Sequence, residues 1–191
     1  DKPQQFPYAV FGDSDKLKVG DEVLAMGSPL SLSQSVTEGI VSNARMTMPS
    51  LYRNNAFKLD GENVGSIVRW IGHDAAIYPG NSGGPLVDLS GKVIGINEIS
   101  LGLGGAIPGN LAHEVARELI ADGKVDRAFL GLLLQPLFKH EDGPEVTGVI
   151  VSDVIKDSPA DKAGIESGDR LLDLAGHKVD IHFAEELPPL N

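Results

Sequence analysis

Residues 78–86 combine one serine with three glycines in a pattern that suits a serine nucleophile. Such a serine must present its hydroxyl on a sharp turn, with backbone N–H groups pointing to the position where an oxyanion forms. Gly80, Gly83 and Gly84 let the backbone turn tightly around Ser82 and leave room for a substrate carbonyl. On turn chemistry alone, an ordinary glycine-rich β-turn is an equally good interpretation, with the serine only satisfying backbone groups.

A serine protease also needs a histidine base and an acid that orients the histidine. His73 is the histidine nearest to Ser82 in the sequence, and Asp74 follows it. Nine residues of strand and turn are not built to fold back onto the serine hydroxyl, so we expect a packing or surface role for His73. His113 is expected to be solvated or half-buried on a helix. The spacings of His140, His177 and His182 fit no metal-ligand pattern. We therefore expect no base for Ser82 among them, and no metal or organic cofactor.

Composition limits the functions that the chain can have. Its 191 residues carry 16 Lys and Arg against 27 Asp and Glu, and this net charge of −11 disfavours binding to nucleic acid or to an anionic membrane. No apolar run approaches the roughly 20 residues that span a bilayer. The absence of cysteine excludes disulfides and thiol catalysis. Because the sequence begins with Asp1 rather than Met, we expect a processed product or a fragment.

Short strands and one helix are predicted for the part of the chain that holds Ser82. The 23 glycines are an excess typical of many strands joined by tight turns. Strands are expected at residues 22–26, 35–44, 66–71 and 92–97, and a long mobile loop at residues 45–66. Gly39 is a candidate β-bulge within its strand. Asn110 can cap a helix with apolar residues at helical spacing, and Gly123 ends it.

A second composition begins at Phe129, so we expect two units that divide near residue 127. The second unit should contain an apolar strand from Phe129 and another strand at residues 146–154. Ser158 and Pro159 have the types expected for the cap and first turn of a short helix, which Gly164 closes.

These segments together resemble the HtrA (DegP-like) family of trypsin-like serine proteases. The residues that carry the resemblance to the family's second β-barrel are 12–15, 19–21, 27–29, 36–42, 74–77, 78–86, 95–97 and 106–108. Residues 129–132, 158–160, 163–165 and 168–169 resemble parts of a PDZ domain. The implied fold is mainly β, with the second β-barrel of a trypsin-like (chymotrypsin-fold) protease at residues 1–127. A truncated α+β PDZ-like domain is implied at residues 128–191.

The resemblance implies roles for individual residues of the protease part. Ser82 would attack the scissile carbonyl, and the N–H groups of Gly80 and Ser82 would stabilise the oxyanion. Ala76 would form the floor of the specificity pocket, and its small apolar side chain would favour aliphatic substrate residues. A simple core position is the alternative for Ala76. The walls would come from Tyr78 and from residues 99–105, including Ile99 and Gly105.

Three departures from the family pattern are visible. Asn81 stands where digestive trypsin-like enzymes carry an Asp that pairs with a new amino terminus, so activation by such cleavage is not expected. HtrA proteases share this Asn, and the resemblance implies that loop rearrangement is their switch. Gly105 replaces the family's usual Phe, which changes the expected pocket shape. The family's catalytic His and Asp lie upstream of the stretch that matches residues 6–15. We therefore expect this chain to carry the nucleophile without its base and acid, and to be inactive alone.

The PDZ-like part is expected to bind a chain end. Backbone N–H groups of Leu130, Gly131 and Leu132 would hold the terminal carboxylate of a peptide that adds as an extra strand. Pro188 and Pro189 leave no room for the second helix of a full PDZ groove, so the domain is expected to be truncated. A plain buried strand at residues 129–132 is the alternative interpretation.

Two functions follow from these patterns. The resemblance implies a periplasmic or otherwise extracytoplasmic serine endopeptidase, usually homotrimeric, that degrades unfolded or damaged proteins and needs no cofactor. The alternative is a non-catalytic, protease-like scaffold whose PDZ module binds peptides or unfolded chains. The intact glycine–serine loop at residues 80–85 favours the endopeptidase, because a chain that had lost catalysis would have little reason to keep it.

Overall fold

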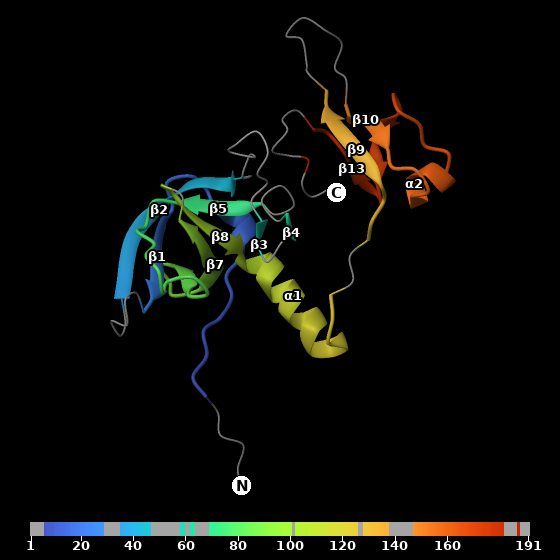
Figure 1. Cartoon of the computed structure of the whole chain (residues 1–191). Helices are drawn as coiled ribbons and strands as arrows, with labels where there is room; N and C mark the ends of the chain where they lie inside the picture. The colour runs from blue at the N-terminus through green and yellow to red at the C-terminus, as the bar shows by residue number, and fades with distance from the viewer. Residues whose placement is uncertain are drawn as a thin grey trace, which may run out of the picture. The chain divides into compact units, whose positions relative to one another are not determined.

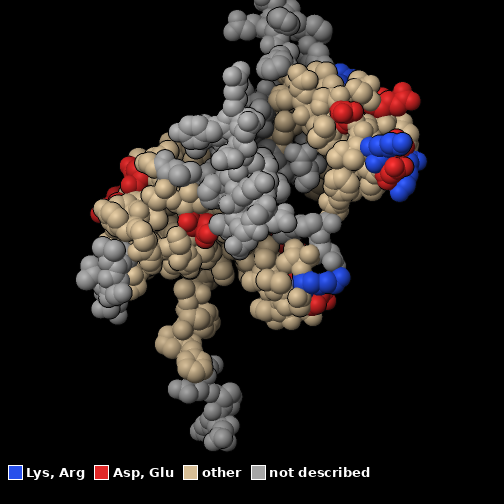
Figure 2. Space-filling model, viewed as in Figure 1, with Lys and Arg blue, Asp and Glu red and all other residues tan. Residues whose placement is uncertain are grey.

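The computed structural model describes residues 6–28, 35–46, 58–59, 62–63, 69–100, 102–125, 128–137, 147–181 and 187 (Figure 1). The chain divides into two compact units. The first comprises Asp1–Met48 and Arg69–Val125, and the second comprises Pro49–Val68 and Asp126–Asn191. None of the described helices is long and apolar enough to cross a lipid bilayer. On the face seen in Figure 2, the described Lys and Arg side chains lie in small groups beside Asp and Glu.

The first unit is a closed barrel of six antiparallel strands, as the mainly β expectation requires. Neighbouring strands follow the order β1-β2-β5-β8-β7-β6 around the barrel. Their bounds are β1 Glu22–Gly27, β2 Ser35–Met46, β5 Trp70–His73, β6 Pro85–Asp88, β7 Val93–Ser100 and β8 Gly104–Pro108. Closure leaves no unpaired edge strand in this sheet, so the barrel is a stable platform for the loops that leave it.

The barrel core is made from residues that alternate along the strands. Val23 and Ala25 of β1 are fully buried, whereas Glu22 is exposed, which is the inward–outward alternation of a strand covered on one side. Leu86 of β6 and Ile94 of β7 fill the same interior. The other members of this cluster are Val41, Ile71, Ala75, Ile77 and Ala106.

The four strands expected in this unit are confirmed, with ends that differ by at most four residues. The strand expected at 66–71 is β5, which begins at Trp70; residues 66–68 lie outside the described residues. The expected loop at 45–66 also lies largely outside them, although β3 (Lys58–Leu59) and β4 (Glu62–Asn63) pair with each other there.

The expected bulge at Gly39 is wrong. Gly39 pairs in regular register with Val23, and the irregularities of β2 fall further along, in its pairing with β5. Glycine is needed here because the loop after β5 approaches closely: a Cβ atom would lie 2.2 Å from the backbone nitrogen of Ala75. Gly39 does mark a position that requires glycine. The reason is its close contact with the segment that leads to Ser82, and not a bulge.

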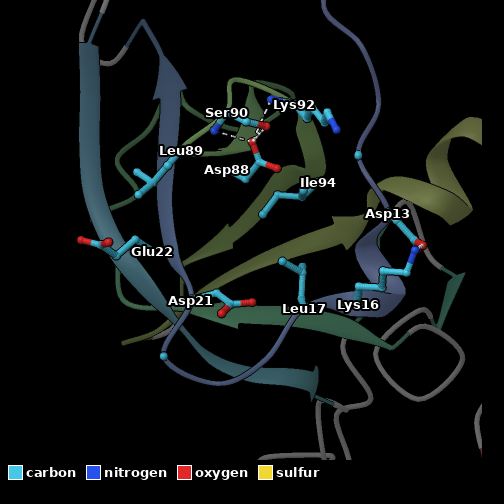
Figure 3. Close-up of a pocket in the computed structure, with 12 residues that line it drawn as sticks. Asp13, Lys16, Leu17, Asp21, Glu22, Asp88, Leu89, Ser90, Lys92 and Ile94 are labelled. Atoms are coloured by element: carbon cyan, nitrogen blue, oxygen red, sulfur yellow. Dashed lines mark hydrogen bonds and ion pairs between the residues drawn. The ribbon is translucent and has the colours of Figure 1, made fainter.

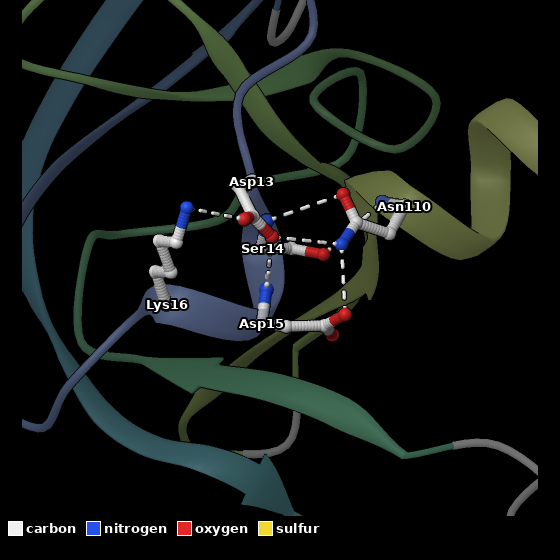
Figure 4. Close-up of polar contacts among 5 residues, drawn as sticks. All are labelled: Asp13, Ser14, Asp15, Lys16 and Asn110. Carbon is white, nitrogen blue, oxygen red and sulfur yellow. Dashed lines mark hydrogen bonds and ion pairs between the residues drawn. The ribbon is translucent and has the colours of Figure 1, made fainter.

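The helix α1 (Gly109–Asp122) begins two residues earlier than expected, and Asn110 does not cap it. Pro108 occupies the cap position and offers no side-chain hydrogen bond. The short helix η1 (Ser14–Lys16) supplies the cap instead, because the Asn110 N–H donates to the Ser14 hydroxyl at 3.0 Å (Figure 4). Gly123 ends α1 in the left-handed conformation, as expected.

The Asn110 side chain is used to hold η1 against the helix start. Its Nδ2 donates to Asp13 Oδ1 at 3.0 Å and to Asp15 Oδ2 at 2.9 Å, and its Oδ1 accepts the Ser14 N–H at 3.3 Å (Figure 4). These contacts link segments more than 90 residues apart in the sequence. The Asn110 hydrogen bond, with help from Lys16, lowers the pKa of Asp13.

The second unit contains a three-stranded sheet and a short helix. The sheet order is β11-β10-β9, with β9 at Leu132–Pro136, β10 at Val149–Val154 and β11 at Arg170–Leu171. The hairpin strands β12 (Asp173–Leu174) and β13 (His177–Lys178) follow. Ser158 caps α2 (Pro159–Lys162) by accepting the Asp161 N–H at 3.2 Å, which confirms the expected cap and first-turn proline.

The Ser14 hydroxyl should stabilise the barrel by capping α1 from outside the helix. Replacing an N-cap hydroxyl typically costs about 1 kcal/mol, so Ser14→Ala should lower the free energy of unfolding by about 1 kcal/mol in chemical denaturation. Ser100→Ala is the matched control, since Ser100 is exposed and its hydroxyl makes no hydrogen bond among the described residues. Equal stabilities of the two variants would contradict the capping role.

Candidate active site

Ser82 lies on two successive tight turns between β5 and β6. The Asn81 N–H donates to the Tyr78 carbonyl at 2.9 Å, and the Gly84 N–H donates to the Asn81 carbonyl at 2.9 Å. Ser82 is exposed, whereas Asn81 beside it is fully buried. The backbone therefore presents the serine side chain to solvent and turns the preceding side chain into the barrel. This is the presentation that a nucleophile needs.

We call residues 78–85 the nucleophile loop, and β7 holds its second half. The Gly83 N–H donates to the Asn97 carbonyl at 2.7 Å, and the Asn97 N–H donates to the Gly84 carbonyl at 2.9 Å. The Asn97 side chain adds a third bond, from Nδ2 to the Pro85 carbonyl at 3.0 Å. Asn97 is fully buried, so one interior residue fixes three successive residues of the loop.

Gly84 is required by a close approach to β1. A Cβ atom at this position would lie 2.1 Å from the Met26 carbonyl oxygen, which is a backbone atom that cannot rotate away. Gly83 differs, because its φ of 84° is left-handed but the space beside it is open. Glycine is thus required at position 84 for steric reasons and at position 83 for its backbone conformation.

Two N–H groups of the nucleophile loop are available to a substrate. Among the described residues, the N–H groups of Gly80 and Ser82 donate to no protein acceptor. The Gly80 carbonyl, by contrast, accepts the Ser28 N–H at 3.1 Å, and its φ of 108° is favourable only for glycine. Uncommitted backbone donors beside an exposed serine are the groups that could stabilise an oxyanion.

The Ser82 hydroxyl donates to the backbone carbonyl of Glu98 in β7 at 2.9 Å. A base would have to draw the hydroxyl proton away from this carbonyl before the oxygen could attack a substrate. The hydroxyl is therefore held in one orientation and is not activated by any titratable side chain that contacts it in the described part of the chain.

The expected packing role of His73 is confirmed. The ring is fully buried in β5, and a Cβ atom on Gly104 of β8 would come within 2.3 Å of its Cε1 atom. Desolvation by this burial lowers the pKa of His73. His113 stacks on Phe11, with ring centroids 5.0 Å apart, and His177 is exposed in β13. His140 and His182 lie outside the described residues.

The four residues expected around the specificity pocket fall into two groups. Ala76 and Tyr78 are exposed in the segment before Ser82, and the Ala76 carbonyl accepts the Thr37 hydroxyl at 2.8 Å. Ile99 and Gly105 face each other across β7 and β8, and both are buried. The structure thus brings Ile99 and Gly105 together in the barrel wall and places Ala76 and Tyr78 on the loop side.

Three residues that support the nucleophile loop had no predicted role. Asn97 is buried among apolar neighbours in β7, and Thr37 of β2 holds the Ala76 carbonyl. Asp74 accepts the Ile40 N–H at 2.7 Å and so joins the segment before Ser82 to β2. In the sequence, Asn97 stood out only as the polar end of an expected strand and as part of the segment 95–97 that resembles the family.

The loop expected to hold a carboxylate lies at the start of β9. The carbonyl of Leu130 accepts the Ala160 N–H at 3.0 Å, and the carbonyl of Gly131 accepts the Ile155 N–H at 2.8 Å. The N–H groups of Leu130 and Gly131 donate to no acceptor in the described part of the chain. Gly131 has a φ of 82°, and a Cβ atom there would lie 2.2 Å from the Ser158 Cβ atom.

The strand β9 can accept a further strand. It lies at the edge of its sheet, where Leu132 pairs with Val154 of β10 and the other side has no described partner. An unpaired edge is the position where an extended peptide can add by backbone hydrogen bonds. Leu132 is buried, and Leu130 packs partly buried against the same cluster, so the start of β9 is fixed by its core contacts.

A hollow of about 600 Å³ lies beside η1 and the turn that joins β6 to β7 (Figure 3). Leu17 and Ile94 line it between the carboxylates of Asp21 and Asp88. Asp88 accepts the N–H groups of Ser90 and Lys92, so its carboxylate stabilises the β6–β7 turn. No group of three or more metal-ligating side chains occurs among the described residues, here or elsewhere.

Comparison with protein-family models gives two matches. The model described as "Trypsin-like peptidase domain" matches residues 1–96, and the model described as "PDZ domain" matches residues 150–186.

Curated relatives give a narrower family. The chain is 42% identical over 193 residues to a "Probable periplasmic serine endoprotease DegP-like" of Chlamydia pneumoniae, covering 94% of this chain and 36% of that protein. A protein of the same description from Marinomonas sp. is 41% identical and is covered to 36% of its length. The chain therefore spans about a third of the length of these relatives.

Solved structures give the same family. "HtrA-type protease AlgW with decapeptide" is similar with a TM-score of 0.64 and 34% identity, covering 94% of this chain and 55% of that one. "Crystal structure of the serine endoprotease from Yersinia pestis" is similar with a TM-score of 0.57 and 34% identity, covering 90% and 53%.

Alanine at the two adjacent glycines should separate steric from conformational requirements. Gly83→Ala should lower the free energy of unfolding by about 1–2 kcal/mol, the cost of a left-handed backbone with a Cβ atom. Gly84→Ala should cost about 3 kcal/mol, because its Cβ atom collides with the Met26 carbonyl. Denaturant unfolding of both variants measures the difference. A larger loss for Gly83→Ala would contradict the close packing of the nucleophile loop on β1.

Proposed function

Because the chain belongs to the HtrA family of trypsin-like serine proteases, we propose that it carries the nucleophile of a serine endopeptidase that degrades unfolded or damaged proteins. Residues 1–127 are the C-terminal half of the protease domain, and residues 128–191 are a partial PDZ domain. The observation that carries this proposal is the nucleophile loop itself. It presents an exposed Ser82 beside two N–H groups that have no protein acceptor among the described residues.

The reaction is acyl transfer through Ser82. Its Oγ atom forms a bond to the scissile carbonyl carbon, and its proton passes to a histidine base that an aspartate orients. The N–H groups of Gly80 and Ser82 stabilise the oxyanion of the tetrahedral intermediate. The base then gives the proton to the leaving amine, and water hydrolyses the acyl-enzyme. The histidine and aspartate belong to the first barrel of the family's fold, so this chain alone is inactive.

The specificity pocket favours aliphatic side chains. Ala76 forms its floor and offers no charge to a Lys or Arg side chain, while Tyr78, Ile99 and Gly105 form its walls. The exposure of Ala76 and Tyr78, and the contact between Ile99 and Gly105 across two strands, support these positions. Substrates with small aliphatic residues before the scissile bond should therefore be cleaved fastest.

The second unit binds the carboxy terminus of a peptide at the edge of β9. Leu130, Gly131 and Leu132 hold its carboxylate, and the uncommitted N–H groups of Leu130 and Gly131 support this assignment. Similar HtrA-type structures carry a decapeptide or a tripeptide in their descriptions. The parent protein is a homotrimer of the periplasm, where relatives of this description are placed by name.

A serine-directed fluorophosphonate tests the nucleophile. We expect Ser82 to be labelled in a version extended upstream to include the first barrel, and not in the 191-residue chain, because only the former has a base. Mass spectrometry locates the adduct, and Ser82→Ala in the extended version is the control. Absence of labelling in both versions would overturn the endopeptidase in favour of a non-catalytic, peptide-binding scaffold.

Peptide titration tests the second unit. A peptide with a free carboxy terminus should bind at least about tenfold more tightly than its amidated form, because the free terminus makes charge-assisted hydrogen bonds. Gly131→Ala should abolish the difference, whereas Gly164→Ala, which has open space beside it, should keep it. Equal binding of both peptides to the unaltered chain would remove the carboxylate-binding role.

A further inference from the structure

The segment that leads to Ser82 alternates between the barrel core and the solvent. Ala75 and Ile77 are buried in the core, whereas Ala76 and Tyr78 are exposed. The residues proposed for the floor and one wall of the specificity pocket therefore lie on the solvent side of one segment, and their neighbours anchor it to the barrel. Because peptide units are planar, the position of the Ala76 side chain is set by the orientation of the two peptide units that flank it.

Strand β2 holds this segment at two points. The first is Asp74, whose Oδ1 accepts the Ile40 N–H at 2.7 Å and whose own N–H donates to the Ile40 carbonyl at 3.2 Å. The second lies two residues further along, where the Ala76 carbonyl accepts the Thr37 hydroxyl at 2.8 Å. The first point is a backbone and side-chain pair at the end of β5, whereas the second acts directly on the proposed pocket floor.

The Thr37 hydroxyl makes the one short hydrogen bond to the Ala76 carbonyl among the described residues. The second donor is Nδ2 of Asn81, which lies 3.5 Å from the same oxygen, longer than an ordinary N–H···O hydrogen bond. A hydroxyl has a single proton, and the other acceptor near Thr37 is the Ala25 carbonyl at 3.5 Å. The proton therefore goes to Ala76, and one side chain fixes the peptide unit that follows the pocket floor.

The turn that carries Ser82 is fixed by different contacts. Gly83 and Gly84 bond to the backbone of Asn97, and the Ser82 hydroxyl donates to the Glu98 carbonyl. These bonds join the loop to β7 and not to β2. Loss of the Thr37 hydroxyl should therefore change the pocket without changing the reactivity of Ser82, which a general loss of structure would not do.

We propose that Thr37 is a positioning residue for substrate selection, whose hydroxyl sets the depth of the specificity pocket by fixing the Ala76 carbonyl. A methyl group at the floor shortens the pocket relative to glycine, so the pocket selects valine before the scissile bond over the longer leucine. One methylene in an apolar pocket changes the rate by roughly 10–200-fold, provided that the floor stays in place. The proposal rests on the proposed function, because it concerns the pocket beside Ser82.

Two variants of the version extended upstream separate the hydroxyl from the bulk of the side chain. Thr37→Val removes the hydroxyl and keeps a β-branched shape, whereas Thr37→Ser keeps the hydroxyl. The substrates are valine and leucine peptides capped at both ends, which offer no carboxylate to the second unit. Thr37→Val should lower the ratio of their kcat/KM values at least about fivefold, mainly by raising KM for the valine peptide. Thr37→Ser should keep the ratio, and a small alkyl fluorophosphonate should label Ser82 at the same rate in all three proteins.

The matched control is Glu38→Gln, on the same strand as Thr37. Glu38 is exposed, and its side chain makes no hydrogen bond or ion pair among the described residues, so the valine preference should stay as it is. An unchanged preference in Thr37→Val, or an equal loss in Thr37→Ser, would overturn the proposal. If Thr37→Val does not fold, Thr37→Ala removes the same hydroxyl with less bulk, and the same loss of preference is expected.

Binding measured without cleavage separates this proposal from the endopeptidase assignment. In the extended version with Ser82→Ala, fluorescence anisotropy gives the Kd of the same capped peptides. A valine preference that Thr37→Val removes in this background supports the role of Thr37 even if a fluorophosphonate never labels Ser82, in which case the endopeptidase assignment alone fails. If Ser82 is labelled but valine and leucine peptides bind alike, or keep their preference in Thr37→Val, the assignment holds and the role of Thr37 is overturned.

Discussion

The backbone pairing between the nucleophile loop and Asn97 is the interaction on which the rest of the site depends. The Gly83 N–H and the Gly84 carbonyl both bond to the backbone of Asn97, so this part of the loop is joined to β7 in the manner of a strand. The Asn97 side chain extends the contact to Pro85, where β6 begins. From Gly83 onward the loop is therefore part of the barrel wall. Ser82 is the residue just before this paired segment.

This arrangement explains why so many small or polar residues gather around one serine. Backbone that approaches other backbone closely leaves no room for side chains, and Gly39 and Gly84 both lie at such approaches. Each hydrogen bond adds only about 0.5–1.5 kcal/mol of net stability. Unpartnered polar atoms on His73, Asn81 and Asn97 offset part of that gain. The buried polar residues thus hold the loop in its conformation but lower the stability of the barrel. Such a compromise is common at functional sites.

The fold class and the exposed serine turn could be predicted from the sequence because they depend on local patterns. Alternating apolar residues located β1, β2 and β7 to within three residues, and the glycines around Ser82 marked its turns. The supporting contacts could not be predicted, because they join distant segments. The cap of α1 comes from Ser14, which lies 96 residues away from Asn110, and the need for glycine at position 39 arises from Ala75. A single sequence shows the residue types of such pairs without showing that they meet.

Hydrogen exchange of two neighbouring amides measures the central claim most directly. By NMR at constant pH, the Gly83 amide, which donates to Asn97, should exchange at least about a hundredfold more slowly than its unprotected rate, as amides of barrel strands do. The Ser82 amide, which donates to no described acceptor, should exchange close to its unprotected rate. Rapid exchange at both amides would contradict the pairing of the loop with β7. Slow exchange at both would show that the Ser82 N–H is already committed and is not available to an oxyanion.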